Sequence, residues 1–197
     1  MNTIGSIEAL LLSEDPASVQ AFTEALLLSE DPGPAQACHL SFTEEYQQQS
    51  NWCWAATTAS ITKFYDPNTT WTQCALANHE FNQTTCCQNG SSAACNRAWY
   101  PDRALTTTGH LRSSSSSSAT FGTVAGEIDA SRPVSIGIYW NGGGGHSLVI
   151  TGYDKSNPNA PTIDIHDPYY GPTIQDANSF PSTYNGGATW GLTCFTQ

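Results

Sequence analysis

Basic residues are scarce in this chain of 197 residues, which has 6 Lys and Arg against 17 Asp and Glu and a net charge of −11. Proteins that bind nucleic acids or anionic membranes neutralise phosphates with Lys and Arg, so neither partner is expected. No run approaches the roughly 20 apolar residues that a membrane-spanning helix requires. The 39% of hydrophobic and 11% of aromatic residues are nevertheless enough to bury a sizeable core.

Motifs for binding phosphates and metals are missing as well. The glycines at 142–145 are followed by neither Lys-Ser nor Lys-Thr, and no Gly-x-Gly-x-x-Gly opens a helix, so a nucleotide site is not indicated. The usual Cys-x-x-Cys pairs of zinc sites are absent, and a set of Cys74, His79, Cys86 and Cys95 has irregular spacing. We therefore expect no metal ion and no cofactor.

Cysteine, in contrast, is abundant, and the number of cysteines is seven. If one thiol is reserved for chemistry, the other six can form three disulfide bonds, which indicates an oxidising compartment and a secreted or extracellular protein, although no signal peptide is visible. The sequence leaves the pairing open. We favour disulfides that fasten the segment 83–96 within itself or to a helix, and one that joins the two ends of the domain; the cysteines concerned are Cys74, Cys86, Cys87 and Cys95 for the first, and Cys38 and Cys194 for the second.

The remaining cysteine, Cys53, has the surroundings of a nucleophile. The residues that follow it, 54–65, contain neither Gly nor Pro and have apolar residues at helical spacing, until Pro67 stops the helix. A thiol at a helix N-terminus readily becomes a thiolate, because the helix dipole and a neighbouring imidazolium both favour the anion. The alternatives for Cys53 are half of a disulfide bond or an inert buried thiol.

His146 is the candidate base. It follows the glycines at 142–145, which allow backbone and substrate to approach closely, and it begins an apolar and β-branched run at 147–153 that predicts a half-buried strand. A histidine at the start of a strand is held rigidly. His166 is the alternative base, since it stands beside Asp167.

Asp167 is the candidate for the residue that orients the histidine. It ends a predicted strand at 162–166, and a hairpin between this strand and the strand at 147–153 would bring its carboxylate to the far nitrogen of His146. The sequence Asp-Pro-Tyr-Tyr-Gly that starts here is also a good turn. Asp154 and Asp164 are alternatives for the same role.

Three blocks of the sequence, at 47–55, 132–154 and 163–171, resemble the papain-like cysteine peptidases, and among them the bacteriocin-leader peptidases and the secreted effector proteases of plant pathogens. The resemblance extends over about residues 38–197. It implies that Gln47, six residues before Cys53, donates to the oxyanion hole together with the backbone N–H of Cys53, with Gln48 and Gln49 as alternatives. Papains usually have Asn where this chain has Asp167.

The resemblance also implies an α+β fold, in which the nucleophile helix packs against an antiparallel sheet that carries the histidine and the aspartate. The residue patterns agree with this plan. Besides the helix at 54–65 they predict helices at 70–81 and 123–130, and strands at 134–140, 147–153, 162–166 and 189–196. The serine run at 113–118 is too polar to pack and is expected to form an exposed loop.

Residues 1–37 are expected to be an acidic extension of a peptidase domain at 38–197. They contain six acids and no Lys or Arg, and the sequence Glu-Ala-Leu-Leu-Leu-Ser-Glu-Asp-Pro occurs in them twice, at 8–16 and 24–32. Two copies do not make a solenoid. Asp15 and Pro16 favour the start of a short amphipathic helix. The extension is either a pro-segment or a flexible acidic tail.

These residues together predict a cysteine-type endopeptidase that hydrolyses protein or peptide substrates through a thioester acyl-enzyme. Cys53 would attack the substrate, His146 would shuttle the proton, Asp167 would orient His146, and Gln47 would help to hold the oxyanion. Two alternatives are open. The same triad could serve acyl transfer or amidase chemistry, or the chain could be a disulfide-rich secreted binding module without activity.

Overall fold

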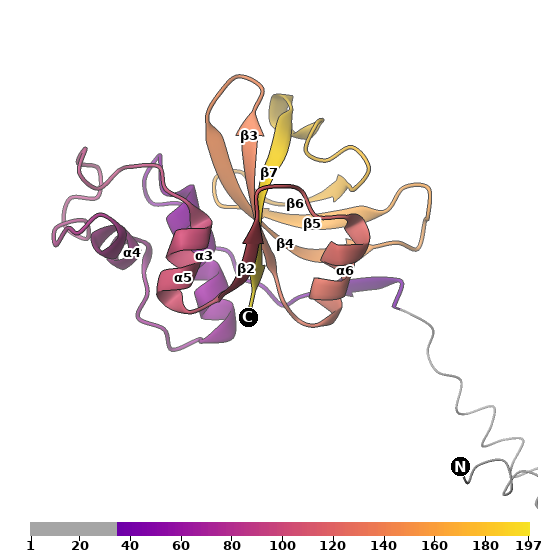
Figure 1. The fold of residues 1–197 in the computed structure, drawn as a ribbon, viewed down its shortest axis with the longest axis horizontal. Coiled ribbons are helices and arrows are strands. Elements are labelled where there is room, and N and C mark those ends of the chain that lie inside the picture. Colours follow the sequence, from indigo (N-terminus) through magenta and orange to yellow (C-terminus); the bar gives the residue numbers. More distant parts are fainter. Residues whose placement is uncertain (1–34) are drawn as a thin grey trace, which may run out of the picture. The chain divides into compact units, whose positions relative to one another are not determined.

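Seven antiparallel strands form one sheet at the centre of the computed structural model, which describes residues 35–197. Helices cover both faces of the sheet, so the predicted α+β architecture is confirmed (Figure 1). The strands are β1 (Ala37–His39), β2 (Leu111–Ser115), β3 (Val134–Trp140), β4 (Gly145–Asp154), β5 (Thr162–Asp167), β6 (Gly171–Asp176) and β7 (Ala188–Thr196). The helices are α3 (Cys53–Tyr65), α4 (Gln73–Glu80), α5 (Pro101–Thr108) and α6 (Phe121–Asp129), with one short turn of 3-10 helix, η1 (Tyr184–Gly186).

The strand order is β2-β7-β3-β4-β5-β6, and β1 pairs with the last residues of β4. Strands β3, β4, β5 and β6 follow one another in antiparallel hairpins. Consequently β4 begins at the same end of the sheet at which β5 finishes. His146 is the second residue of β4 and Asp167 the last residue of β5, so the hairpin expected from the sequence brings these two residues to one end of the sheet.

The two faces of the sheet have separate cores, because successive side chains of a strand point to opposite sides. On one face α6 covers residues such as Ile136, Leu148 and Ile150. On the other face Val149 packs against Ile61 of α3 and other buried residues of α5 and β7. The helix that carries Cys53 therefore lies on one face only, with its first turn near the end of the sheet where His146 lies.

Helix α3 is buried continuously from Trp54 to Thr62, although it contains several polar residues. Their hydroxyl groups donate to backbone carbonyl oxygens three or four residues earlier, at 2.7–3.1 Å. A buried hydroxyl without a partner would cost about 1–3 kcal/mol, and these bonds remove that cost. The sequence can thus bury a helix of small polar and alanine residues without leaving its hydroxyl groups unpaired.

Two disulfide bonds, Cys74–Cys87 and Cys86–Cys95, fasten the segment between α4 and α5, as expected for these four cysteines. Because their sulfur atoms are joined in pairs, these cysteines are not available as thiolate ligands for zinc. Each bond closes a short loop, with sequence separations of 13 and 9 residues.

The segment with the disulfide bonds also holds the start of α3. The indole N–H groups of Trp52 and Trp54 donate to the carbonyl oxygens of Cys95 and Arg97, at 2.8 and 3.0 Å. Asn51 also makes two hydrogen bonds of 3.0 Å to Asn96. The residues on either side of Cys53 are therefore attached to a part of the chain about 43 positions away.

The expected disulfide between Cys38 and Cys194 is wrong, since both are free thiols. Cys38 packs against the core on the α6 face of the sheet, whereas Cys194 is buried on the face that α3 and α5 cover. The sheet separates the two sulfur atoms, a relationship that their spacing in the sequence does not reveal.

The prediction for the serine run is wrong in part. The run is exposed as expected, but Leu111–Ser115 form β2, an edge strand that pairs with β7. Its hydrogen bonds come from the backbone, which any residue type supplies. The other elements without a prediction are β1, β6, α5 and η1. The repeated segments at 8–16 and 24–32 and the helix expected there lie outside the described residues. Within residues 35–197, no helix has the length and hydropathy that would let it span a membrane.

The number of reactive thiols tests this arrangement. In denaturant without a reductant, three cysteines are expected to react with iodoacetamide, namely Cys38, Cys53 and Cys194, and the other four only after reduction. Peptide mapping by mass spectrometry assigns each modified residue. A single reactive cysteine, which three disulfides would give, would contradict the structure.

Candidate active site

Cys53 is the first residue of α3, and its thiol is half-buried. No side chain caps the N-terminus of this helix, so the N–H groups of its first turn are free to favour a negative charge. The hydrogen bonds from Asn51, Trp52 and Trp54 to the segment with the disulfide bonds hold this turn in place. Residues before and after Cys53 are therefore both held by hydrogen bonds, and these restrict the position of its sulfur atom.

His146 follows a tight turn at the end of β3. Gly143 and Gly144 have φ angles of +92° and +88° in this turn, a conformation that residues with a Cβ rarely adopt. Trp140 stacks on the imidazole of His146, with 5.8 Å between the ring centroids and 25° between the planes. The glycines and the tryptophan together orient the histidine ring.

Asp167 has a fully buried carboxylate that accepts four hydrogen bonds. Nε2 of His146 and the backbone N–H groups of Tyr169 and Tyr170 donate to its Oδ1, at 2.7–2.9 Å, and the hydroxyl of Tyr184 donates to its Oδ2 at 2.7 Å. Burial acts to raise the pKa of Asp167. The hydrogen bond and charge of His146 and the two backbone N–H groups outweigh burial, and the pKa of Asp167 lies below its usual range. Asp167 is therefore ionised at neutral pH.

Cys53 and His146 stabilise each other's charged forms. Burial alone would lower the pKa of His146, but hydrogen bonds to Asp167 and Cys53 and their negative charges raise it to about 9. Burial alone would likewise raise the pKa of Cys53, but hydrogen bonds from His146 and Ser147 and the charge of His146 hold it below the usual range of a thiol. Both shifts favour the pair in which Cys53 is a thiolate and His146 an imidazolium.

The alternative base, His166, lies elsewhere. It is next to Asp167 in the sequence, and successive residues of a strand point to opposite faces. Its ring is edge-on to Phe42, with 5.1 Å between the centroids. The alternative acids have other partners as well: Asp164 interacts with His39, and Asp154 accepts a hydrogen bond from the backbone N–H of Ser156.

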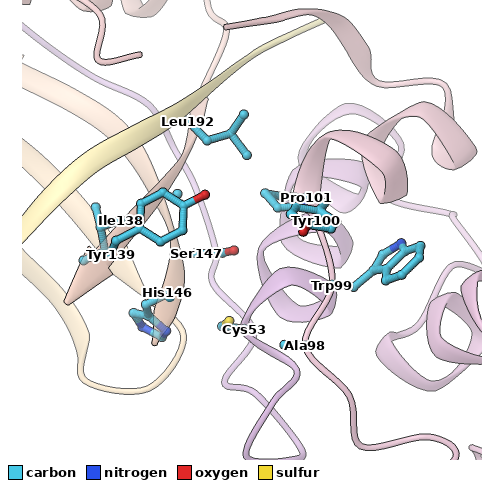
Figure 2. A pocket seen from close by; sticks show the side chains of 12 residues that line it. Cys53, Ala98, Trp99, Tyr100, Pro101, Ile138, Tyr139, His146, Ser147 and Leu192 are labelled. Carbon is cyan, nitrogen blue, oxygen red and sulfur yellow. The ribbon is translucent and has the colours of Figure 1, made fainter. Parts of the chain in front are cut away.

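Two pockets meet at Cys53 and His146. The larger has a volume of about 400 Å³ and lies between the segment before α5 and strands β3, β4 and β7. Figure 2 shows Cys53 between His146 on the sheet side and Ala98 on the other side, with further lining from Trp99, Pro101, Tyr139 and Leu192. The smaller pocket, of about 190 Å³, has Trp140, Tyr169 and Tyr170 in its wall. Apart from His146, no side chain that lines either pocket belongs to a charged residue type.

Gln47 lines the smaller pocket together with Cys53, but its amide is already engaged. Its Nε2 donates to the carbonyl oxygens of Gln49 and Ser50, at 2.9 and 3.0 Å, while its Oε1 is buried without a partner. An oxyanion would have to replace one of these two carbonyl groups. The backbone N–H of Cys53, at the first position of the helix, has no competing acceptor within the helix.

Comparison with known proteins assigns the chain to a family. Residues 35–185 match the model of a family described as papain-like cysteine protease AvrRpt2. The chain belongs to this family. The match includes all four residues selected from the sequence, Gln47, Cys53, His146 and Asp167. No curated protein matches the chain.

Two solved structures are similar to this AvrRpt2 family member at low identity. A double-glycine motif protease from an AMS/PCAT transporter, crystallised with its leader peptide, is 16% identical, with a TM-score of 0.45 over 83% of this chain and 100% of that chain. The Pseudomonas avirulence protein AvrPphB is 11% identical, with a TM-score of 0.37 over 80% of this chain and 96% of that chain.

Three residues of this AvrRpt2 family member lie at the candidate site without having been predicted. Ser147 lines the larger pocket beside Cys53 and helps to lower the pKa of its thiol. Its place directly after His146 was the available signal. Trp140 precedes the glycine turn and stacks on His146. Tyr184 belongs to the short helix η1 and has no local sequence pattern that relates it to Asp167.

The thiolate–imidazolium pair has a kinetic signature. At pH 6, well below the ordinary thiol pKa of about 8.5, Cys53 is expected to react with iodoacetamide faster than the other free thiols, because His146 lowers its pKa. Cys194 serves as the internal control, since burial raises its pKa to about 12. His146→Ala should slow the modification of Cys53 at pH 6 at least about tenfold, a change equivalent to one pKa unit. Peptide mapping over time measures both rates, and an unchanged rate in the variant would contradict the pair.

The carboxylate of Asp167 has a separate effect. Asp167→Asn removes the negative charge that helps to raise the pKa of His146, so this pKa should fall by about one unit or more from its value of about 9. NMR titration of the labelled imidazole measures the change. Tyr184→Phe is the matched control because it keeps the carboxylate, and an equal pKa in Asp167→Asn and the unmodified protein would show that the charge has no such effect.

Proposed function

We propose that the protein is a cysteine-type endopeptidase that cleaves peptide bonds through a thioester acyl-enzyme. The observation that supports this proposal best is the continuous arrangement of Cys53, His146 and Asp167 at the junction of two pockets. A thiolate beside an imidazolium, with a buried carboxylate behind it, supplies a nucleophile, a proton donor and a group that orients the donor.

The proposed reaction has two steps. In the first, the sulfur of Cys53 attacks the carbonyl carbon of the substrate, His146 gives its proton to the leaving amine, and the C–N bond breaks to leave a thioester. In the second, water attacks the thioester while His146 accepts a proton, the C–S bond breaks, and a carboxylic acid leaves. Asp167 stays ionised and holds His146 in one orientation throughout.

The oxyanion of each step would lie near the N-terminus of α3. The backbone N–H of Cys53 and the free N–H groups of the first turn favour a negative charge there. Gln47 would contribute its amide by exchanging Gln49 or Ser50 for the oxyanion. Because this exchange costs one existing hydrogen bond, the contribution of Gln47 is smaller than that of a donor with no other partner.

The lining of the pockets favours an uncharged peptide. The larger pocket has Ile138, Pro101 and Leu192 in its wall, and it offers neither a carboxylate nor an ammonium group to a charged substrate side chain. Burying an unpaired charge there would be costly. We therefore propose an apolar or aromatic substrate residue in this pocket, next to the bond that is cleaved.

The two disulfide bonds support a secreted or extracellular location for part of the life of the protein, since such bonds form in oxidising compartments. They do not distinguish hydrolysis from acyl transfer. Acyl transfer by the same three residues is the alternative function, and it differs only in the acceptor that attacks the thioester.

A peptide library tests the proposal. Peptides with an apolar or aromatic residue near the scissile bond are expected to be cut at a higher kcat/KM than matched peptides with Lys or Glu there, because the larger pocket has no charged partner. Mass spectrometry of the new termini measures the products. Cys53→Ala and His146→Ala should lower kcat by at least about 10³-fold.

The same assay with excess hydroxylamine separates the two functions. Without the amine, a hydrolase turns over and gives a free carboxylic acid, whereas an acyl transferase does not turn over; with hydroxylamine, both can release a hydroxamate. Cleavage that persists in Cys53→Ala would contradict the proposal. So would a protein whose Cys53 reacts selectively with iodoacetamide but which cleaves none of the peptides.

A further inference from the structure

Gln73, the first residue of α4, is a buried polar residue whose side chain is fully engaged by the loop before the nucleophile helix. Only 1% of the residue is exposed. Its Nε2 donates to the backbone carbonyl oxygen of Tyr46 at 2.9 Å and to Oε2 of Glu45 at 3.2 Å, and its Oε1 accepts from the backbone N–H of Gln48 at 2.9 Å. Because a buried amide is unfavourable without partners, these bonds hold Gln73 and the loop together.

The two backbone groups that Gln73 binds lie on either side of Gln47. One amide can satisfy both of them because, like a peptide unit, it carries a donor and an acceptor. The backbone of Gln47 is also held from the sheet, since its own N–H donates to the carbonyl oxygen of Pro168 at 2.9 Å. Three successive residues of the loop are therefore fastened, one to the turn after β5 and its two neighbours to α4.

The position of this backbone decides what the side chain of Gln47 can reach. Gln47 lines the smaller pocket together with Cys53, and its Nε2 has to leave Gln49 or Ser50 before it can donate to an oxyanion. A side chain that exchanges one partner for another finds the second only if its own Cα stays in place. Gln73 lines neither pocket, so any effect on the reaction would pass through the backbone of Gln47.

We propose that Gln73 is a positioning residue for Gln47: it holds the loop at the place from which the Gln47 amide reaches the oxyanion. The inference rests on the oxyanion site of the proposed function, but it does not require that a peptide is cleaved. It concerns the step in which a negative charge develops on oxygen, and it leaves the ionisation of Cys53 unchanged.

Two reagents that react with the same thiol separate these effects. Iodoacetamide alkylates the sulfur of Cys53 by displacing iodide from a saturated carbon, so no oxyanion forms. With p-nitrophenyl acetate the sulfur attacks a carbonyl carbon and an oxyanion forms; the C–O bond then breaks, p-nitrophenolate leaves, and the acetyl group stays on Cys53 as a thioester. The ratio of the acylation rate to the alkylation rate therefore reports on the oxyanion site alone.

The rates are measured on the full chain at neutral pH. Absorbance of p-nitrophenolate, after subtraction of the rate in Cys53→Ala, gives acylation, and peptide mapping gives alkylation. A donor at an oxyanion is worth about 10²–10³-fold in rate, and the exchange of partners reduces this for Gln47, so Gln47→Ala should lower acylation about tenfold. Gln73→Met, apolar and of similar length, should lower acylation by about three- to tenfold and leave alkylation unchanged.

The double variant distinguishes positioning from a general loss of structure. If Gln73 acts through the Gln47 amide, adding Gln73→Met to Gln47→Ala should slow acylation no further, because the amide to be positioned is already gone. Independent effects would instead multiply.

Gln83→Met is the matched control. The Nε2 of Gln83 also donates to two backbone carbonyl oxygens, those of Phe81 and Asn82, so the same substitution removes bonds of the same kind at the other end of α4. Both rates should stay at their unmodified values. Gln73→Asn replaces Gln73→Met if methionine does not fold in the buried site, because its amide is polar but one methylene too short to bridge the two backbone groups.

Several outcomes would overturn the inference. Unchanged acylation in the Gln73 variants would mean that the loop keeps its place without Gln73, and unchanged acylation in Gln47→Ala would mean that no oxyanion donor is there to be positioned. Acylation and alkylation that fall by the same factor, or a double variant slower than Gln47→Ala, would assign Gln73 a structural role only. If the rates change as expected but no peptide is cleaved, the inference stands and the proposed peptidase function fails.

Discussion

The candidate active site depends on the contact between the thiol of Cys53 and the imidazole of His146, and each partner is held by a different layer of the fold. The thiol belongs to the first turn of a buried helix that the segment with the disulfide bonds fixes through Trp52 and Trp54. The imidazole belongs to the second residue of a central strand. A hydrogen bond tolerates displacements of only a few tenths of an ångström, so the packing of α3 on the sheet has to be as exact as the hydrogen bonds within each layer.

The charges of the site follow from the number of donors at each carboxyl group. Four donors make Asp167 an anion, whereas neither carboxyl oxygen of the buried Glu44 has a hydrogen-bond partner among the described residues, and burial raises its pKa. The negative charge of Asp167 favours the imidazolium form of His146, and this imidazolium in turn favours the thiolate form of Cys53. Removing one partner of a buried charge pair costs about 3–5 kcal/mol because the other charge is left uncompensated, so Asp167 and His146 depend on each other.

Local patterns in the sequence were sufficient for the elements that carry these groups. A segment without Gly or Pro after Cys53, a glycine turn before His146 and an aspartate at the end of a strand each correspond to an element found at that place. The strand at 134–140 coincides with β3, and the helix predicted at 70–81 begins three residues before α4 and ends one residue after it. Hydrophobic periodicity works here because these elements bury one side or both.

Features that depend on the three-dimensional path of the chain were not accessible in this way. The faces of the sheet on which Cys38 and Cys194 lie follow from strand register, and Tyr184 reaches Asp167 from a helix of three residues. The serine run forms an edge strand through backbone bonds that its composition does not indicate. The engagement of the Gln47 amide by Gln49 and Ser50 depends on the bend of a loop, which spacing alone does not define.

The domain contains both the free thiol of Cys53 and two disulfide bonds, so the choice of reductant matters. A thiol reagent that regenerates an oxidised Cys53 is also a potential attacker of the bond between Cys86 and Cys95, whose segment holds the first turn of α3. The reduction of an oxidised Cys53 and the opening of the Cys86–Cys95 bond are thus the same type of thiol–disulfide exchange at two places in the molecule. In a strongly reducing cytosol, the working lifetime of the molecule would be set by how slowly that second exchange proceeds.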